Sequence, residues 1–377
     1  MTNPITPGQI KKSNRQLIYD FIYKKEKVSQ QDICYSLHLS RPTVTTNLAE
    51  LEEAGAIYKN GQLESDLLGR KAAAYSVVPD YRAAVGVELL EREVSVHIVD
   101  LKGRDLDCVA VELPYEKDEH YFLRVCELIK DLVGKHAFCD EQILGVGIAV
   151  QGLVSEDGKS IVYGAIMENT GLGIDAFSRH IPYPCRFIHD SESAALWELW
   201  NSPERKDAIY LSLSHHLGGA IIARGLVRAG KHGHHATFEH IQIESEGKLC
   251  YCGRRGCMET VLSMDALLDG EAPEPFFRAV RMGREPQSER WNSYLSRLAK
   301  LIGNLHLIMD FDVILGGALA PYFSEEDIRY LYQEIDDRTP FPDAFDYISV
   351  GSASPAGVSR GAALLYIRPF LEDIDAP

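Results

Sequence analysis

The stretch LCYCGRRGC, residues 249–257, holds three of the eight cysteines in the chain. Cysteines this close together form a metal site, a redox pair or a chance cluster. In a reducing compartment, where disulfides are rare, clustered thiols favour a metal. The two glycines of the stretch allow its backbone to turn tightly enough for the sulfur atoms to converge.

The composition limits what the rest of the chain can be. With 377 residues, the sequence is long enough for two or three domains with substantial cores. It has neither an apolar run of the ~20 residues that a membrane span needs nor a secretory signal at its start, so we expect a cytoplasmic protein without membrane contact. The net charge of −16 is carried by the residues after 80, which leaves the first segment as the only candidate for contact with a polyanion.

Residues 1–80 carry the signals of a winged helix-turn-helix. Ser29 and Ser40 stand at positions that cap helices, and Gly55 follows the helix that Ser40 begins. That helix, within SRPTVTTNLAELEEAG, would present its outer face to base edges and phosphates. We predict that this face binds DNA through Arg41, Thr43, Thr45, Thr46 and Asn47. The alternative is a three-helix bundle that binds protein.

The segments AIYKNGQL and KAAAYSVV predict the two strands of the wing, with a turn at Asn60-Gly61. A Gly-Arg-Lys run between the strands would place Arg70 and Lys71 in a narrow minor groove, although an exposed basic turn explains the run equally well. Six early basic residues either lie along a phosphate backbone or form a solvated helix face. They are Lys11, Lys12, Arg15, Lys24, Lys25 and Lys27.

From residue 81 onward the pattern is that of an α/β fold. Three short strands, AAVGVELL, EVSVHIVD and LDCVAVEL, precede a helix near 115–134 and the apolar strand ILGVGIAV. This order is typical of the ribonuclease-H-like unit of actin and sugar kinases, and AIYLSLS with GGAIIARG repeats its opening. We predict a ligand cleft between two lobes. Lobe one covers about 81–190 plus a C-terminal helix at 355–377, and lobe two covers about 191–354.

Over nearly its whole length the chain resembles the repressor, open-reading-frame, kinase (ROK) family. The family signature is a His, about ten residues, and then Cys-x-Cys-Gly-x-x-Gly-Cys-x-Glu, which His240, Cys250, Cys252, Cys257 and Glu259 match in this chain. Three thiolates and one imidazole form a closed tetrahedral set, so the resemblance implies a structural Zn²⁺ held by the His and the three Cys. We interpret the other five cysteines as small buried hydrophobic residues.

The resemblance also implies a sugar site. In FIHDSESAALWEL, Asp190 matches the carboxylate that takes a proton from a sugar hydroxyl, although it could instead cap the helix that follows. His240 would serve both the metal and the sugar, Asn169 matches the asparagine of a sugar loop, and Glu259 either reaches sugar hydroxyls or caps its own loop. The kinase pattern has a Glu three residues before the zinc His, where this chain has Thr237, so one sugar carboxylate is missing.

The phosphate-binding turns of the family's kinases are altered. The first turn, Asp-x-Gly-Gly-Thr in kinases, is Glu-Leu-Leu-Glu at residues 88–91, and Ser-His-His at 214–216 crowds the second. Glycines are needed where the backbone approaches nucleotide phosphates, and an added carboxylate repels them. We therefore expect no phosphoryl transfer.

These features predict an α/β protein in which an N-terminal winged helix-turn-helix precedes a two-lobed ribonuclease-H-like, actin-like ATPase (sugar kinase) fold. We expect a transcriptional repressor of carbohydrate metabolism whose catalytically inactive body senses a sugar or sugar phosphate. It would bind double-stranded operator DNA as a homodimer or tetramer. Two alternatives remain: an active ATP-dependent sugar kinase with a DNA-binding head, and a regulator whose body binds a protein partner.

Overall fold

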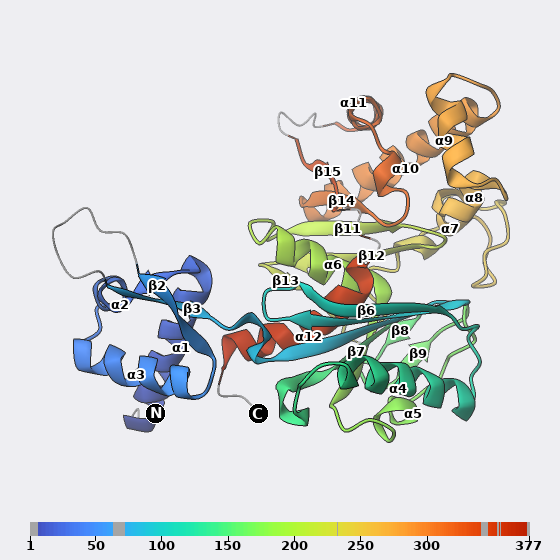
Figure 1. The fold of residues 1–377 in the computed structure, drawn as a ribbon. Coiled ribbons are helices and arrows are strands. Elements are labelled where there is room, and N and C mark those ends of the chain that lie inside the picture. Colours follow the sequence, from blue (N-terminus) through green and yellow to red (C-terminus); the bar gives the residue numbers. More distant parts are fainter. Residues whose placement is uncertain are drawn as a thin grey trace.

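The computed structural model describes residues 7–62, 72–231, 233–340, 346–352, 354 and 356–374. Figure 1 shows a small N-terminal head beside a larger body that contains two five-stranded sheets. Within the described ranges, no helix combines the length and the apolar character that a membrane crossing requires.

The head consists of three helices and a three-stranded antiparallel sheet. They are α1 (Pro7–Lys25), α2 (Gln30–Leu37), α3 (Arg41–Glu53) and, in spatial order, β1 (Val28–Ser29), β3 (Ala73–Val77) and β2 (Ile57–Gln62). Both predicted caps are confirmed, because Ser29 Oγ accepts a hydrogen bond from Asp32 N and Ser40 Oγ accepts one from Thr43 N. Each cap satisfies a backbone N–H that has no partner inside its helix and so fixes where the helix begins.

The predicted turn at Asn60-Gly61 is wrong. β2 continues through both residues, and its pairing with β3 shifts register between Lys59 and Gln62. Gly61 has a φ of 68°, which fits a bulge inside the strand. The antiparallel pairing of β2 with β3 still forms the two strands of a wing.

The first sheet of the body begins with the predicted antiparallel meander. In spatial order its strands are β10 (Cys185–His189), β7 (Ile143–Val150), β4 (Ala83–Leu89), β5 (Glu93–Asp100) and β6 (Asp105–Glu112). β7 runs parallel to β4 and β10, whereas β5 is antiparallel to both of its neighbours. Helix α4 (Glu119–Gly134) packs Val125, Ile129 and Leu132 into the core on one face of this sheet. This arrangement agrees with the expected ribonuclease-H-like unit.

The second sheet repeats the antiparallel opening and the parallel continuation. Its strands are β13 (Leu226–Val227), β12 (Leu217–Ala223), β11 (Ala208–Leu213), β14 (Asp312–Gly316) and β15 (Ile348–Val350). The helices around it are α7 (Glu259–Leu262), α8 (Met264–Leu268), α9 (Pro273–Arg281), α10 (Gln287–Met309) and α11 (Glu325–Asp336). Buried Trp291, Leu298 and Ile302 of α10 join Val313 and Leu315 of β14 in one core.

Two helices lie between the sheets, α6 (Asp190–Asn201) and α12 (Gly357–Glu372). Glycines bring α12 into backbone contact with the first sheet and with α6. A Cβ added at Gly86 would lie 1.7 Å from Ser359 O, and one at Gly147 would lie 2.1 Å from Ala362 O. A Cβ at Gly361 of α12 would lie 1.8 Å from a backbone oxygen of α6. Because real atoms do not approach so closely, these contacts exist only with glycine.

The end of α12 reaches the head, as Figure 1 shows. Gln16 of α1 donates a side-chain hydrogen bond to the backbone oxygen of Leu371 and accepts one from Ile374 N. The phenol of Tyr23 donates to Leu101 O at 2.6 Å, and the ammonium of Lys102 lies 3.7 Å from the centre of the Tyr23 ring. The head is therefore held against the body by several polar and aromatic contacts.

Candidate functional site

A cleft of about 460 Å³ lies between the two sheets. Its wall comes from the ends of β4 and β7, the start of α6, the turn between β11 and β12, the short helical turn η3 (Phe238–His240) and the start of α12. Ligands of open α/β sheets bind beyond the carboxyl ends of the strands, which is where these segments meet. The volume lies in the range of small-molecule sites.

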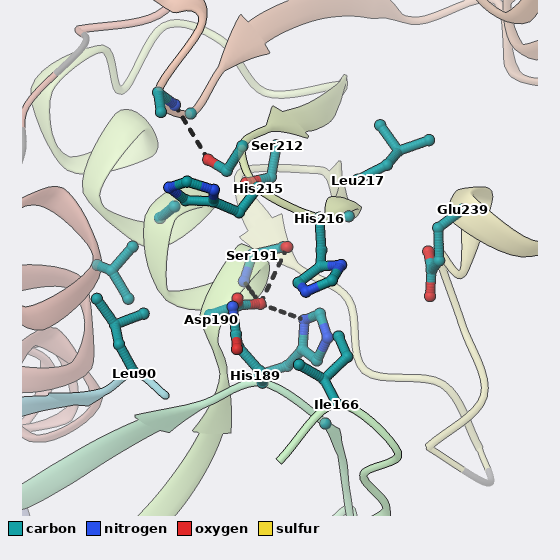
Figure 2. A pocket seen from close by; sticks show the side chains of 18 of the residues that line it. Leu90, Ile166, His189, Asp190, Ser191, Ser212, His215, His216, Leu217 and Glu239 are labelled. Carbon is teal, nitrogen blue, oxygen red and sulfur yellow. Dashed lines mark hydrogen bonds and ion pairs between the residues drawn. The ribbon is translucent and has the colours of Figure 1, made fainter. Parts of the chain in front are cut away.

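Asp190 lies in this cleft at the junction of β10 and α6. Its Oδ1 accepts a hydrogen bond from Ser191 N at 2.6 Å and lies 3.3 Å from His189 Nδ1, as Figure 2 shows. The N-cap of α6 is His189, without a side-chain cap bond, so Asp190 is in the first turn of the helix. This position favours the cleft-facing alternative over the capping one.

The altered phosphate turns both line the cleft. Glu88 and Leu90 project from the end of β4. Burial, together with the nearby charge of Asp190, raises the pKa of Glu88 to about 8. His215 and His216 line the opposite turn, where their Nδ1 atoms lie 2.7 Å from carboxylate oxygens of α8 and α7 respectively.

Glu259 holds a turn of the cleft wall from behind. Its Oε1 lies 2.7 Å from His216 Nδ1, and its Oε2 accepts a hydrogen bond from Leu217 N at 2.8 Å. The side chain is buried, and Glu259 is not among the described residues that line the cavity. These contacts correspond to the alternative in which Glu259 fixes a loop.

Asn169 also lies behind the cleft wall, with 1% of its surface exposed. Its amide donates to Gln151 O at 3.4 Å, and a Cβ added at Gly164 would lie 1.6 Å from its Oδ1. Gln151 and Gly164 line the cavity, whereas Asn169 does not. The expected sugar contact of Asn169 therefore needs correction, because its amide packs against the wall from behind.

Glu239 was missed by the sequence analysis, which found Thr237 in place of a sugar carboxylate. η3 turns Glu239 into the cleft, where it is 7% exposed. Figure 2 shows it across the cavity from Leu90. Within the described part of the chain its Oε2 has no hydrogen-bond partner, and its Oε1 lies 3.9 Å from His240 Nε2. Burial raises the pKa of the Glu239 carboxyl to about 8. The signal was the Glu directly before His240 in TFEH, but only the tight turn reveals that this Glu faces the cavity.

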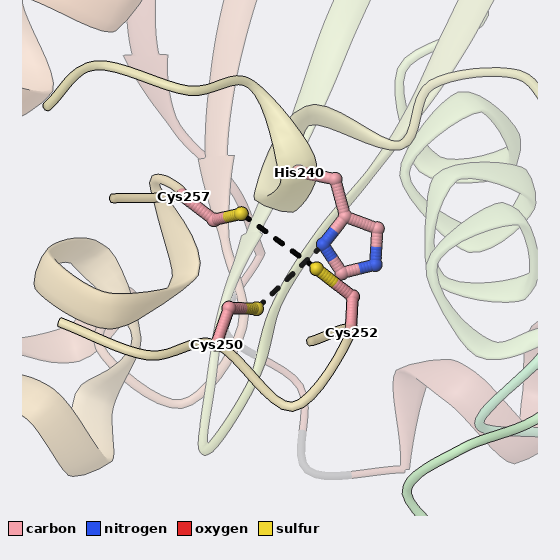
Figure 3. A group of neighbouring side chains, drawn as sticks. All are labelled: His240, Cys250, Cys252 and Cys257. Carbon is pink, nitrogen blue, oxygen red and sulfur yellow. Dashed lines mark hydrogen bonds between the residues drawn. The ribbon is translucent and has the colours of Figure 1, made fainter. Parts of the chain in front are cut away.

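The four residues of the predicted metal site converge, as Figure 3 shows. The ligand atoms of His240, Cys250, Cys252 and Cys257 all lie within 4.8 Å of one another. The Sγ atoms of Cys252 and Cys257 are 3.7 Å apart, and Cys250 Sγ is 3.8 Å from His240 Nδ1. Tetrahedral Zn²⁺ with its usual bond lengths needs about 3.8 Å between sulfurs and about 3.6 Å between sulfur and nitrogen. The geometry therefore fits this ion.

The backbone of the metal loop, which consists of His240 and residues 250–257, requires its glycines. Gly253 has a φ of 83° and Gly256 a φ of 71°, a region that favours glycine. A Cβ added at Gly256 would also lie 1.5 Å from Glu244 O. The backbone turn itself therefore brings the sulfur atoms together.

The interpretation of the remaining cysteines is wrong for two of them. Cys126 is buried, but Cys108 and Cys139 are exposed. Cys108 lies on β6, the edge strand of its sheet, where exposed and half-buried positions alternate. Its side chain therefore points to solvent.

The outer face of α3 carries most of the predicted DNA-binding residues. Arg41, Thr45 and Thr46 are exposed, and Thr43 is half-buried. The prediction that Asn47 lies on this face is wrong, because the residue is 3% exposed and its side-chain amide donates to Thr43 O at 2.8 Å. Its position on the helix places it at the core side of α3, beside buried Leu48 and Leu51.

Part of the basic cluster in α1 is paired within the protein. Lys11 and Arg15 lie 2.6 Å and 3.6 Å from carboxylate oxygens of Glu50, and Lys12 lies 2.7 Å from Asp373 Oδ2. These side chains serve contacts between helices in this structure. Arg70 and Lys71 lie outside the described residues.

Comparison with protein families gives two matches. Residues 84–368 match the ROK family, and residues 12–58 match a family described as winged helix-turn-helix DNA-binding. Among curated proteins, the DNA-binding transcriptional dual regulator NagC of Escherichia coli is 26% identical over 264 residues, which is 68% of this chain and 64% of NagC. The xylose repressor of Caldicellulosiruptor bescii is 23% identical over 393 residues, covering 96% of this chain and 97% of the repressor.

Solved structures share the fold. A ROK family transcriptional regulator described as a homologue of E. coli Mlc superposes with a TM-score of 0.76 at 22% identity, covering 97% of both chains. A ROK family glucokinase from Streptomyces griseus, solved with glucose and AMPPNP, gives a TM-score of 0.67 at 20% identity and covers 76% of this chain and 99% of the kinase. The arrangement of the body is thus common to regulators and kinases.

Proposed function

The chain belongs to the ROK family, and from that premise we propose that it is a DNA-binding transcriptional repressor of carbohydrate metabolism whose body senses a sugar. One observation carries the proposal: the same chain contains a winged helix-turn-helix and a sugar-sized cleft, and a single helix, α12, contacts both. The start of α12 lines the cleft, and its end contacts α1. The similarity to NagC and to a xylose repressor supports the same function.

DNA binding is assigned to the exposed start of α3. Arg41 can reach a base edge or a phosphate, and the hydroxyls of Thr45 and Thr46 stand on the same exposed face. One head offers few contacts, so we propose a homodimer or tetramer that binds two operator half-sites. We place the head at residues 1–80 and the ROK body at 81–377.

The sugar is assigned to the cleft wall. Asp190 can accept a hydrogen bond from a sugar hydroxyl, and His240 borders both the cleft and the metal loop. A structural Zn²⁺ held by His240, Cys250, Cys252 and Cys257 would keep this wall in place, since a closed set of four ligands leaves no position for catalysis.

We propose that the body does not transfer phosphate. Leu90 occupies the cleft wall where the family's kinases have glycine, and Glu91 follows it with an added carboxylate. His215 and His216 fill the second turn. Side chains at these positions compete with the nucleotide phosphates for space, and the carboxylate of Glu91 repels their charge.

Sugar binding would act on DNA binding by linkage. A sugar that binds one arrangement of the lobes more tightly shifts the population toward it. A tenfold change in operator affinity needs ~1.4 kcal/mol of difference between the two arrangements. The backbone contacts of α12 with Gly86 and Gly147 make this helix the element that can carry the change to the head.

The test uses the full chain and a DNA site that it selects from a random pool. Arg41→Ala should weaken binding to that site by roughly tenfold or more, as expected for loss of a base or phosphate contact of ~1–3 kcal/mol. Arg284→Ala, an exposed position on the body, is the matched control. Failure to select any site would contradict the proposal, and sugar-dependent turnover of ATP would favour the kinase alternative.

A further inference from the structure

The charge of the cleft wall restricts the class of sugar that can bind. Four carboxylates line the cavity, those of Glu88, Asp190, Glu198 and Glu239. No Lys or Arg is found among the described residues of the wall. Phosphate groups are usually bound by Arg and Lys or by free backbone N–H groups at helix starts. At the start of α6, one such N–H already donates to Asp190 Oδ1.

The histidines of the wall do not reverse this charge. His189 lies 3.3 Å from Asp190 Oδ1, and His215 and His216 each lie 2.7 Å from a carboxylate oxygen, of Asp265 and Glu259 respectively. Each imidazolium would therefore neutralise a carboxylate of its own. His240 Nε2 lies 3.9 Å from Glu239 Oε1, which is too far for a hydrogen bond, and as a ligand of Zn²⁺ this imidazole would be neutral. The carboxylates of the wall that have no histidine partner remain in excess.

Two carboxylates of the wall differ in how well they are satisfied. Glu198 accepts hydrogen bonds from the backbone N–H and the hydroxyl of Ser352. Glu239 is 7% exposed, and its Oε2 has no hydrogen-bond partner among the residues that the structure describes. A buried acceptor without a donor costs free energy, which a donor on a ligand can recover. The raised pKa of Glu88, caused by burial and by Asp190, also reflects a shortage of positive charge in the cleft.

We propose that the ligand of the cleft is an amino sugar, with a protonated amine and no phosphate, whose ammonium group binds Glu239. This inference rests on the proposed function of the body as a sugar sensor. An ammonium group has three donors and no acceptor, so it satisfies carboxylates without leaving an unpaired oxygen of its own. Charge-assisted hydrogen bonds are also stronger than those of neutral hydroxyls.

The experiment measures affinity by calorimetry on the full, zinc-loaded chain. The probes are D-glucosamine, D-glucose, N-acetyl-D-glucosamine and D-glucosamine 6-phosphate, followed by the amino and neutral forms of galactose and mannose. For at least one sugar, the free amine should bind about tenfold or more tightly than the neutral and N-acetyl forms. The 6-phosphate should bind most weakly.

Two variants assign the preference to residues. Glu239→Gln removes the charge while keeping the size of the side chain, so the amine and the neutral sugar should bind about equally. Glu246→Gln, an exposed Glu in the following loop, should leave the tenfold preference unchanged. If Glu239→Gln loses its zinc, Asp190→Asn provides a second reduction of charge at a distance from the metal ligands in sequence.

The outcomes separate this inference from the proposed function. Equal or tighter binding of neutral or phosphorylated sugars would overturn the amino-sugar assignment and leave the sugar sensor intact. Binding of no sugar, in a protein that still binds its DNA site, would overturn both. Stabilisation by Mg²⁺ or Ca²⁺ alone, abolished by Glu239→Gln, would show that the carboxylates hold a metal ion instead.

Discussion

The metal loop and the cleft share His240 but use their polar atoms in opposite ways. In the loop, defined by His240 and residues 250–257, each ligand atom lies close to other ligand atoms, and Gly253 and Gly256 fix the turn. In the cleft, carboxylates from separate segments face a common cavity, and Glu239 Oε2 has no partner. A set that is complete within the chain stabilises the fold, whereas an incomplete one costs stability and is kept for a ligand. The comparison teaches where to expect stability and where to expect binding.

The largest expected effect tests the loop. Cys250→Ser should remove the metal and lower the free energy of unfolding by about 4 kcal/mol or more, because loss of a metal is among the most destabilising changes. Zinc content and thermal denaturation measure it. Cys139→Ser, at an exposed cysteine, should change stability by less than about 0.5 kcal/mol. Unchanged zinc content or stability in Cys250→Ser would contradict the structural role of the metal.

A smaller effect is expected where the loop supports the cleft. Glu259→Ala leaves Leu217 N without its acceptor and removes the partner of His216. We expect a loss of about 1–3 kcal/mol, the cost of an unsatisfied buried donor. Denaturant unfolding measures this loss, with Glu246→Ala as the exposed control. Equal stability of the two variants would show that the turn does not depend on Glu259.

In the cleft, a substitution should increase stability where those in the metal loop decrease it. Glu239→Gln replaces a buried carboxylate that lacks a donor, so the ligand-free protein should become more stable by about 1 kcal/mol. The same variant should lose the preference for the amine. A decrease in stability at normal zinc content would mean that Glu239 supports the fold, and the contrast between loop and cleft would then fail at this position.

The last expected effect is a pH dependence. The folded pKa of Glu88 is about 8, against an ordinary value of 4.5. Between these values the folded protein keeps a proton that the unfolded chain releases, so the stability contributed by this group falls as pH rises from about 4.5 to about 8. The melting temperature of Glu88→Gln should change less with pH over this range than that of the wild type. Glu91→Gln, at an exposed position, should keep the pH dependence of the wild type. Identical pH profiles of wild type and Glu88→Gln would exclude a buried, protonated Glu88.

The features that local sequence determines were predicted well. The caps at Ser29 and Ser40 bond to N–H groups three residues away, and the cysteines of the loop lie within eight residues of one another. The three strands that open the body, and the helix and apolar strand after them, also followed from periodicity and chain order. In these cases the interacting groups are close in sequence, so spacing alone brings them together.

The predictions were wrong where the direction of a side chain depends on contacts distant in sequence, or where a shift by one residue changes the face on which it lies. Asn47 faces the core of the head, although its neighbours Thr45 and Thr46 are exposed. The amide of Asn169 packs behind the cleft wall at Gly164, where a side chain larger than hydrogen would displace it. Glu239 faces the cleft only because η3 turns it there. The directions of Asn169 and Glu239 are set by packing against segments elsewhere in the fold. The direction of Asn47 follows from helical spacing, because it lies three residues after buried Val44 and four before buried Leu51.

The contact between Gln16 and Leu371 spans 355 residues and has a consequence for synthesis. The helices of the head leave the ribosome before the body and can begin to fold on their own local signals. The residues of α12 that hold the head against the body emerge only after both sheets have been translated. A nascent chain therefore carries a head that is not yet fixed in position, and the head is oriented by a helix that is made after it.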